Sequence, residues 1–465
     1  MAEPGLSPLL WPLADLTASY ARRDLSPVEV VRDALQRIRA RDAELGSYFT
    51  VLEEAALAQA QSAAAEYARG GARPLLGVPL SIKDLFDVAG ARTTFGSLAH
   101  DPRPAAEDSP AVARLREAGA VFLGKTNTAE FGQSATTETL VGPPARNPWD
   151  PGRTAGGSSG GAAASVGAGL ALAALGSDGG GSIRIPAAFC GLFGLKPTHG
   201  AITGGGRFHA MSDFSCAGPL TRRVADARPL FAVLARVEVA GRSAVPGLKI
   251  AWCPALEGHP VAPEVAQVTE RALQALVGLA AHRLVEMPPP VAGWQDVFRV
   301  LVLAEEWRQR SHLLRSEKVE LTDYEHRTLS AAEKITEAEV EAARADLRRM
   351  RAAYEAYFRD VDLVVTPATA VPAFPIGERP RKIAGRRVDW LWGPFPFTPQ
   401  FNVAGVPAAS LPVGLAGGLP VGLQLVARRG AEGLLLDVAE ALEEAVGFDA
   451  LAPARRGPGV AASAP

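Results

Sequence analysis

Hydrophobic positions recur with two different periods along this chain, which predicts helices alternating with short strands. Ser26-Pro27-Val28-Glu29 is typical of a helix start, with a capping box and proline at the first helical position, and helical spacing continues through Ile38. An alanine-rich stretch over 53–69 predicts a second helix. The apolar run 77–82, bounded by glycine and proline, predicts a buried strand.

The alternation continues to the end of the chain. Helices are expected over 108–118, 159–169, from 182, and over 264–279, 297–315, 331–358 and 433–446; strands are expected over 120–124, 170–176, 248–253, 363–366, and as a pair over 408–411 and 421–425. Strands alternating with helices imply an α/β fold with a mixed or parallel sheet.

One stretch differs in character from its surroundings. Residues 238–358 are more helical and more charged, which predicts a helical lobe inserted into a core of about 75–237 and 361–446. We expect one domain over 1–451. The Pro-, Gly- and Ala-rich end, 452–465, predicts a flexible tail.

Composition narrows the class of protein. Apolar residues make up 48% of 465, enough for a large core, and the net charge of −2 recommends neither nucleic acid nor an anionic membrane as a partner. The longest apolar run, 162–175, is shorter than the ~18 residues of a membrane span, and we expect no signal peptide. Three widely spaced cysteines favour the cytoplasm, and neither they nor the histidines have metal-ligand spacing, so we expect no metal.

The candidate chemistry lies in the glycine-rich block 156–197. Ser158 and Ser182 both follow glycines, and neither is followed by the His/Asp pattern of an ordinary serine hydrolase. Lys83 lies upstream in an apolar segment, so the combination points to a serine nucleophile served by lysine. A flexible linker is disfavoured because an apolar helix and strand follow, and a phosphate cradle lacks Gly-Lys-Ser/Thr.

For Lys83 and Arg184, both a functional and a structural role are open. Lys83 must be neutral to act as a base, and burial among apolar neighbours lowers a lysine pKa, but pairing with Asp84 would make it structural. Arg184 either binds substrate or belongs to an ion pair. The turn Gly179-Gly180-Gly181-Ser182 can direct several backbone N–H groups to one point, as an oxyanion hole requires.

The chain resembles the amidase signature family, the Ser-cis-Ser-Lys amide hydrolases, from about residue 75 to 446. The resemblance rests on separated motifs in family order: Gly-Val-Pro-Leu-Ser-Ile-Lys-Asp ending at 84, Gly124-Lys125-Thr126-Asn127 with Glu130-Phe131, the block 156–197, Gly218-Pro219-Leu220, Asn402-Val403-Ala404-Gly405-Val406-Pro407, and Gly418-Leu419-Pro420-Val421-Gly422-Leu423-Gln424.

The resemblance implies a large mixed, mostly parallel central sheet covered by helices, and it implies roles for individual residues. Ser182 would be the acylated nucleophile, Ser158 the bridging serine after a cis bond from Gly157, and Lys83 the base. The oxyanion hole would use the backbone N–H groups of Gly179, Gly180, Gly181 and Ser182, and Ser159 would support the triad. Most members carry a side chain at the position of Gly179. No cofactor is implied.

Three functions remain open at this stage. The first is hydrolysis of a small-molecule carboxylic or urea-like amide; the others are the glutaminase subunit of a tRNA-dependent amidotransferase and an inactive binding scaffold. Amidotransferase subunits usually carry an acidic residue three positions before the threonine matching Thr398, where this chain has Phe395, which favours the free-standing amidase.

The aromatic cluster of Trp390, Trp392, Phe395 and Phe397 either lines an acyl pocket or plugs the core or a subunit contact. Phe131 and Gln133 are further candidates for the substrate pocket. A homodimer remains open.

Overall fold

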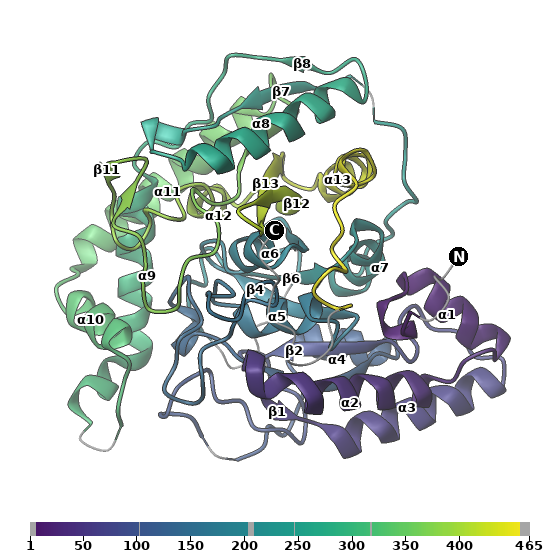
Figure 1. The fold of residues 1–465 in the computed structure, drawn as a ribbon. Helices are drawn as coiled ribbons and strands as arrows, with labels where there is room; N and C mark the ends of the chain where they lie inside the picture. The colour runs from purple at the N-terminus through teal and green to yellow at the C-terminus, as the bar shows by residue number, and fades with distance from the viewer. Residues whose placement is uncertain (1–5, 102, 203–208, 246, 317–318, 456–465) are drawn as a thin grey trace.

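A single large sheet organises the molecule. The structure, a computed structural model, describes residues 6–101, 103–202, 209–245, 247–316 and 319–455. In these residues the sheet has eleven strands in the order β1-β3-β2-β4-β6-β5-β12-β13-β9-β7-β8 (Figure 1). The strands are β1 (Tyr48–Val51), β2 (Pro79–Lys83), β3 (Val121–Thr126), β4 (Ala173–Asp178), β5 (Phe193–Lys196), β6 (Cys216–Thr221), β7 (Lys249–Trp252), β8 (Arg283–Leu284), β9 (Leu363–Pro367), β12 (Ala408–Ala416) and β13 (Leu419–Ala427).

The sheet is mixed, as expected, but the expectation that it is mostly parallel is corrected. Of the ten strand pairings described, six are antiparallel and four parallel. The expected pair β12 and β13 is antiparallel because a turn of two residues, Gly417 and Gly418, joins the strands, and a connection this short cannot make a parallel crossover. β5 and β6 also run antiparallel to their neighbours.

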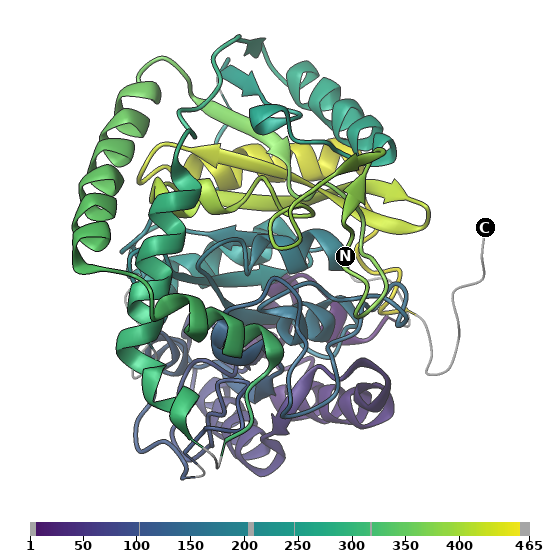
Figure 2. The same cartoon turned by 90° about the vertical axis from the view of Figure 1, so that its left-hand side faces the viewer.

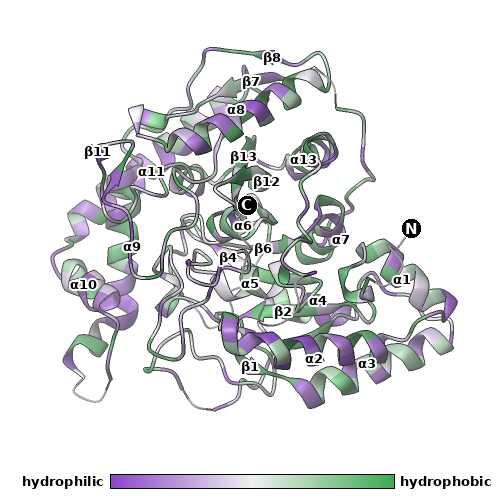
Figure 3. Cartoon of the chain, in the orientation of Figure 1, coloured by the Kyte–Doolittle hydropathy of each residue, from purple (hydrophilic) through white to green (hydrophobic). Residues whose placement is uncertain are grey.

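Helices cover the sheet, and their apolar faces point toward it. In α2 the expected capping box of Ser26 and Glu29 is present, and buried Val31, Leu35 and Ile38 follow at helical spacing. Figure 3 shows hydrophobic residues concentrated on β12 and β13 and polar residues along the outer helices. The helices are α1 (Leu13–Arg22), α2 (Pro27–Leu45), α3 (Glu53–Ala68), α4 (Pro110–Glu117), α5 (Gly160–Gly167), α6 (Arg184–Cys190), α7 (Val224–Ala235), α8 (Pro263–Gly278), α9 (Trp294–Arg310), α10 (Asp323–Ala332), α11 (Glu337–Tyr357), α12 (Pro399–Val403) and α13 (Glu432–Val446).

The segment expected to form a helical lobe also supplies two strands of the central sheet. β7 pairs in parallel with β9, and β8 pairs with β7 at the sheet edge. Helices α9, α10 and α11 pack together beside the core (Figure 2). The helix expected over 331–358 is present as α11 but begins later: α10 ends at Ala332, and α11 starts at Glu337 with a capping box of Thr336 and Glu339.

Two expectations concern the exterior of the molecule. Among the described residues, none of the helices is long and apolar enough to cross a membrane. Most of the tail expected over 452–465, namely 456–465, lies outside the described residues.

Candidate active site

Lys83 lies at the end of β2, a central strand that pairs with β3 and β4. Its side chain is fully buried, and Nζ donates hydrogen bonds to Ser158 Oγ at 2.7 Å and Ser177 Oγ at 2.9 Å. Burial holds the pKa of Lys83 well below its usual range, although the Asp178 carboxylate acts in the opposite direction. A lysine in this setting is suited to be a neutral base.

The alternative to a base role for Lys83 is an ion pair with Asp84. In the structure, Asp84 has another partner. Lys125 Nζ on β3 lies 2.5 Å from Asp84 Oδ1, and both side chains are buried. The second carboxylate oxygen accepts a 2.9 Å hydrogen bond from the Thr94 N–H. Asp84 is therefore satisfied by other groups, and no carboxylate among the described residues forms an ion pair with Lys83.

Ser158 occupies the loop before α5, and the Gly157–Ser158 peptide bond is cis. The space at Gly157 is filled by neighbouring backbone, since a Cβ there would lie 2.6 Å from the Thr136 carbonyl carbon. Ser159 Oγ donates to the Ser177 carbonyl at 3.1 Å, and Ser159 N–H donates to the Ser182 carbonyl at 3.2 Å. Ser159 thus links β4 to the turn that carries Ser182.

Ser177 was missed by the sequence analysis. Its hydroxyl is the second acceptor of Lys83, because the parallel pairing of β2 with β4 places the ends of these strands side by side. The sequence around a serine in a glycine-rich segment does not indicate such a contact. Only the strand order, which the sequence does not display, brings it to Lys83.

Ser182 follows a tight glycine turn and is 9% exposed. Gly181 has φ +128°, and a Cβ there would lie 2.3 Å from Thr398 Oγ1, so this position requires glycine. The Gly181 N–H, one of the four expected in the oxyanion hole, donates to Asp178 Oδ1 at 2.7 Å. Among the described residues, no hydrogen bond is formed between the hydroxyls of Ser158 and Ser182.

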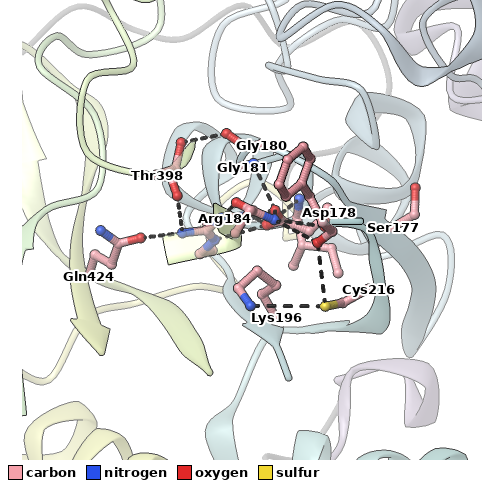
Figure 4. Close-up of polar contacts among 12 residues, drawn as sticks. Ser177, Asp178, Gly180, Gly181, Arg184, Lys196, Cys216, Thr398 and Gln424 are labelled. Carbon is pink, nitrogen blue, oxygen red and sulfur yellow. Dashed lines mark hydrogen bonds and ion pairs between the residues drawn. The ribbon is translucent and has the colours of Figure 1, made fainter. Parts of the chain in front are cut away.

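Asp178 and Arg184 form a fully buried ion pair at 2.9 Å directly behind the turn (Figure 4). Arg184 also donates to the Thr398 carbonyl at 3.0 Å and to Gln424 Oε1 at 2.7 Å. Burial raises the pKa of Asp178, but the Arg184 guanidinium outweighs it, and the net pKa is well below the usual range. Arg184 is therefore a structural ion-pair member, one of the two alternatives.

Comparison with known proteins decides the family. The family model described as Amidase matches residues 29–436. This chain belongs to the amidase family. As a member of it, the protein is an enzyme of the hydrolase class that acts on carbon–nitrogen bonds.

Relatives of the amidase have more than one function. It is 34% identical to a glutamyl-tRNA(Gln) amidotransferase subunit from Chromohalobacter salexigens, over 95% of this chain and 98% of the relative. It is 35% identical to an acylamidase of Rhodococcus erythropolis, over 92% and 94%. A crystal structure of a bacterial aryl acylamidase of the amidase signature family has a TM-score of 0.86 at 28% identity, covering 96% of this chain and 99% of that one.

The aromatic cluster of the amidase divides into three environments. Trp392 packs with Phe298 at 5.5 Å between ring centroids, and both rings approach Gly180 in the turn before Ser182. Trp390 instead lines a cavity of about 480 Å³, and the Arg379 guanidinium lies 4.5 Å from its ring centroid. Phe395 is fully buried, with its ring near Phe189 and Phe374, the last of which also lines the cavity.

These positions separate pocket candidates from core residues. The 480 Å³ cavity is also lined by Thr136, whose backbone abuts Gly157 before Ser158. Phe395 does not line this cavity. Its packing matches the core-plug alternative, and Phe397 is likewise fully buried.

Phe131 and Gln133 flank Gly132, which lies close to Ser158, and both contact the segment 294–332. A Cβ on Gly132, between them, would lie 3.5 Å from Ser158 Oγ. The Phe131 ring packs under the Arg310 guanidinium at 4.4 Å, and Gln133 Nε2 donates to Glu306 on α9. Among the residues that the structure describes, no group of three or more His, Cys, Asp or Glu side chains is placed to hold a metal.

Proposed function

We propose that this amidase hydrolyses a small-molecule carboxylic or urea-like amide through an acyl-enzyme on Ser182. One observation carries the proposal: Lys83 is fully buried and has Ser158 Oγ at 2.7 Å. Desolvation favours the neutral amine, and a neutral amine can accept a proton through Ser158 from Ser182.

The reaction then takes two steps. Ser182 Oγ attacks the amide carbonyl carbon as its proton passes to Ser158, and the proton of Ser158 passes to Lys83. The oxyanion is stabilised by backbone N–H groups of Gly179, Gly180 and Ser182. Breaking the C–N bond releases ammonia or an amine, which takes up the proton, and water then hydrolyses the acyl-enzyme by the reverse proton path.

The test combines covalent labelling with turnover. A fluorophosphonate should label Ser182, and ammonia release should be measured for a panel of primary amides. An adduct confined to Ser158, or to a cysteine, contradicts the assignment. Cys190 and Cys216 are buried, and burial raises the pKa of both thiols, which makes them poor competitors.

The second candidate is the glutaminase subunit of a tRNA-dependent amidotransferase, favoured by the 34% identity to such subunits. Against it stands Phe395, a fully buried ring at the position where those subunits usually carry an acid. Glutamine turnover by the isolated chain, measured beside neutral amides, separates the two. Size-exclusion chromatography tests for a homodimer, and fractionation tests the cytoplasmic location; both stay predictions.

A further inference from the structure

Four carboxyl groups gather where α9 and α10 meet the loop beside Ser158, and three of them have donors. Glu130 accepts from Ser97 Oγ at 2.6 Å and from Thr322 N–H at 2.8 Å. Glu305 accepts from Ser212 N–H at 2.7 Å. Glu306 accepts from Gln133 and from Arg310, whose Nη1 lies 2.7 Å away.

Glu325, on α10, is the exception. Its side chain is fully buried, and neither of its carboxyl oxygens has a donor partner among the described residues. The neighbouring group that acts on it most strongly is the Glu306 carboxyl. Two neighbouring carboxyl groups can form a hydrogen bond only when a proton lies between them, and an ionised carboxylate without donors is costly to bury.

The surrounding charges lead to the same conclusion. The groups facing the pair are Arg310 and Glu305 on α9, and Glu130 before Gln133. Arg310 is the one cation among them. Burial first, and then the neighbouring carboxylates, raise the pKa of Glu325 well above its usual range, and burial raises that of Glu306 to about 7.

We propose that Glu306 and Glu325 share one proton, and that this pair holds α9 and α10 against the loop of Gln133, so that loss of the proton at alkaline pH lowers activity. Few contacts separate this carboxyl pair from Ser158. Glu306 fixes Gln133, and the adjacent Gly132 lies against Ser158 Oγ. When both carboxyls are ionised, they repel each other and compete for Arg310. Glu325 is thus a positioning residue, which acts through Glu306 and Gln133.

The first experiment measures pH profiles of kcat/KM for the best amide of the panel. Wild type should show an alkaline limb that falls about tenfold per pH unit, the slope for loss of one proton. Glu325→Gln keeps a donor toward Glu306 without the charge, so it should retain neutral-pH activity within about threefold and lack this limb. Glu333→Gln, which removes an exposed carboxylate at the end of α10, should keep the limb. An unchanged limb in Glu325→Gln overturns the proposal.

A second measurement does not depend on turnover, so it distinguishes failure of this proposal from failure of the amide-hydrolase assignment. The infrared difference spectrum between wild type and Glu325→Gln at pH 7 should contain the C=O band of a protonated carboxylic acid. Other carboxyl groups with a raised pKa, such as Glu443 with its pKa of about 7, are present in both proteins, so their bands cancel in the difference spectrum. If the band is missing while both proteins are folded, Glu325 is ionised and the proposal is wrong.

Discussion

Asp84 forms its ion pair with Lys125 across the sheet, 2.5 Å away, and not with Lys83, its neighbour in the chain. The parallel register explains this, because Ile82 pairs with Lys125 and Lys83 with Thr126. Two fully buried lysines therefore lie on adjacent strands with different partners: a carboxylate for Lys125 and two hydroxyls for Lys83. Their substitutions should have opposite consequences.

Lys83→Ala should abolish most activity while leaving the protein folded. Loss of a general base costs about 10²–10⁴-fold in rate, and loss of the whole relay costs more. Removing Lys83 leaves the hydroxyls of Ser158 and Ser177 without one partner each, but it leaves no buried opposite charge without an ion-pair partner. The measurement is kcat/KM together with the thermal unfolding midpoint; near-normal turnover in a folded variant would make the lysine structural.

Lys125→Met, the matched control, should instead lower stability. It leaves the buried Asp84 carboxylate without its ion-pair partner, and breaking a buried pair from one side costs about 3–5 kcal/mol. Denaturant unfolding measures this loss. The double variant Asp84→Asn/Lys125→Met should recover part of it, because no buried charge is then left unpaired.

The activity should rise with pH through the lowered pKa of Lys83. Only the neutral amine accepts a proton, and burial shifts the change from charged to neutral amine to lower pH. The acid limb of kcat/KM should therefore have the slope of one proton and lie well below the usual lysine pKa of about 10.4. The same group makes folding less favourable as pH falls, because the unfolded chain binds that proton more readily.

Asp178 should contribute stability that is lost in acid. Its folded-state pKa is depressed, so its contribution is present above the ordinary aspartate pKa of about 3.9 and disappears as the pH falls through the folded value. Asp178→Asn, which leaves Arg184 buried without its carboxylate, should cost about 3–5 kcal/mol at neutral pH. Unfolding curves of both proteins from neutral to acid pH should converge; parallel curves would contradict this role.

The sequence predicts elements with strong local signals and fails where long-range pairing decides. The capping box at Ser26 and the strand expected over 77–82 are local patterns, and both are present, the strand as β2 over Pro79–Lys83. The antiparallel pairings of β5 and β6 depend on strand order, which helix–strand alternation does not reveal. For the same reason the glycine turn pointed to Ser182, but neither Ser177 as a partner of Lys83 nor the capture of the Gly181 N–H by Asp178 was visible.

The aromatic residues provide the last prediction, since Trp392 and Phe395 are three positions apart in different environments. Phe395→Ala should destabilise the fold by about 3–5 kcal/mol, as loss of a buried phenylalanine does, and should leave the ranking of amides unchanged. Trp392→Ala should change that ranking in favour of larger substrates, because its ring borders Gly180 before Ser182. The measurement is kcat/KM for a short aliphatic amide, an arylacetamide and glutamine.

Glutamine should be the poorest of the three substrates for the wild-type enzyme. Its ammonium group needs a carboxylate or several acceptors when desolvated, and an unpaired buried charge is costly. The ring of Phe395, at the position where amidotransferase subunits usually carry an acid, offers no negative charge and packs in the core near Phe189. If glutamine proves the best substrate, or if activity requires added subunits, the amidotransferase function replaces the free-standing amidase. A reversed size ranking in Phe395→Ala would instead return this residue to the pocket.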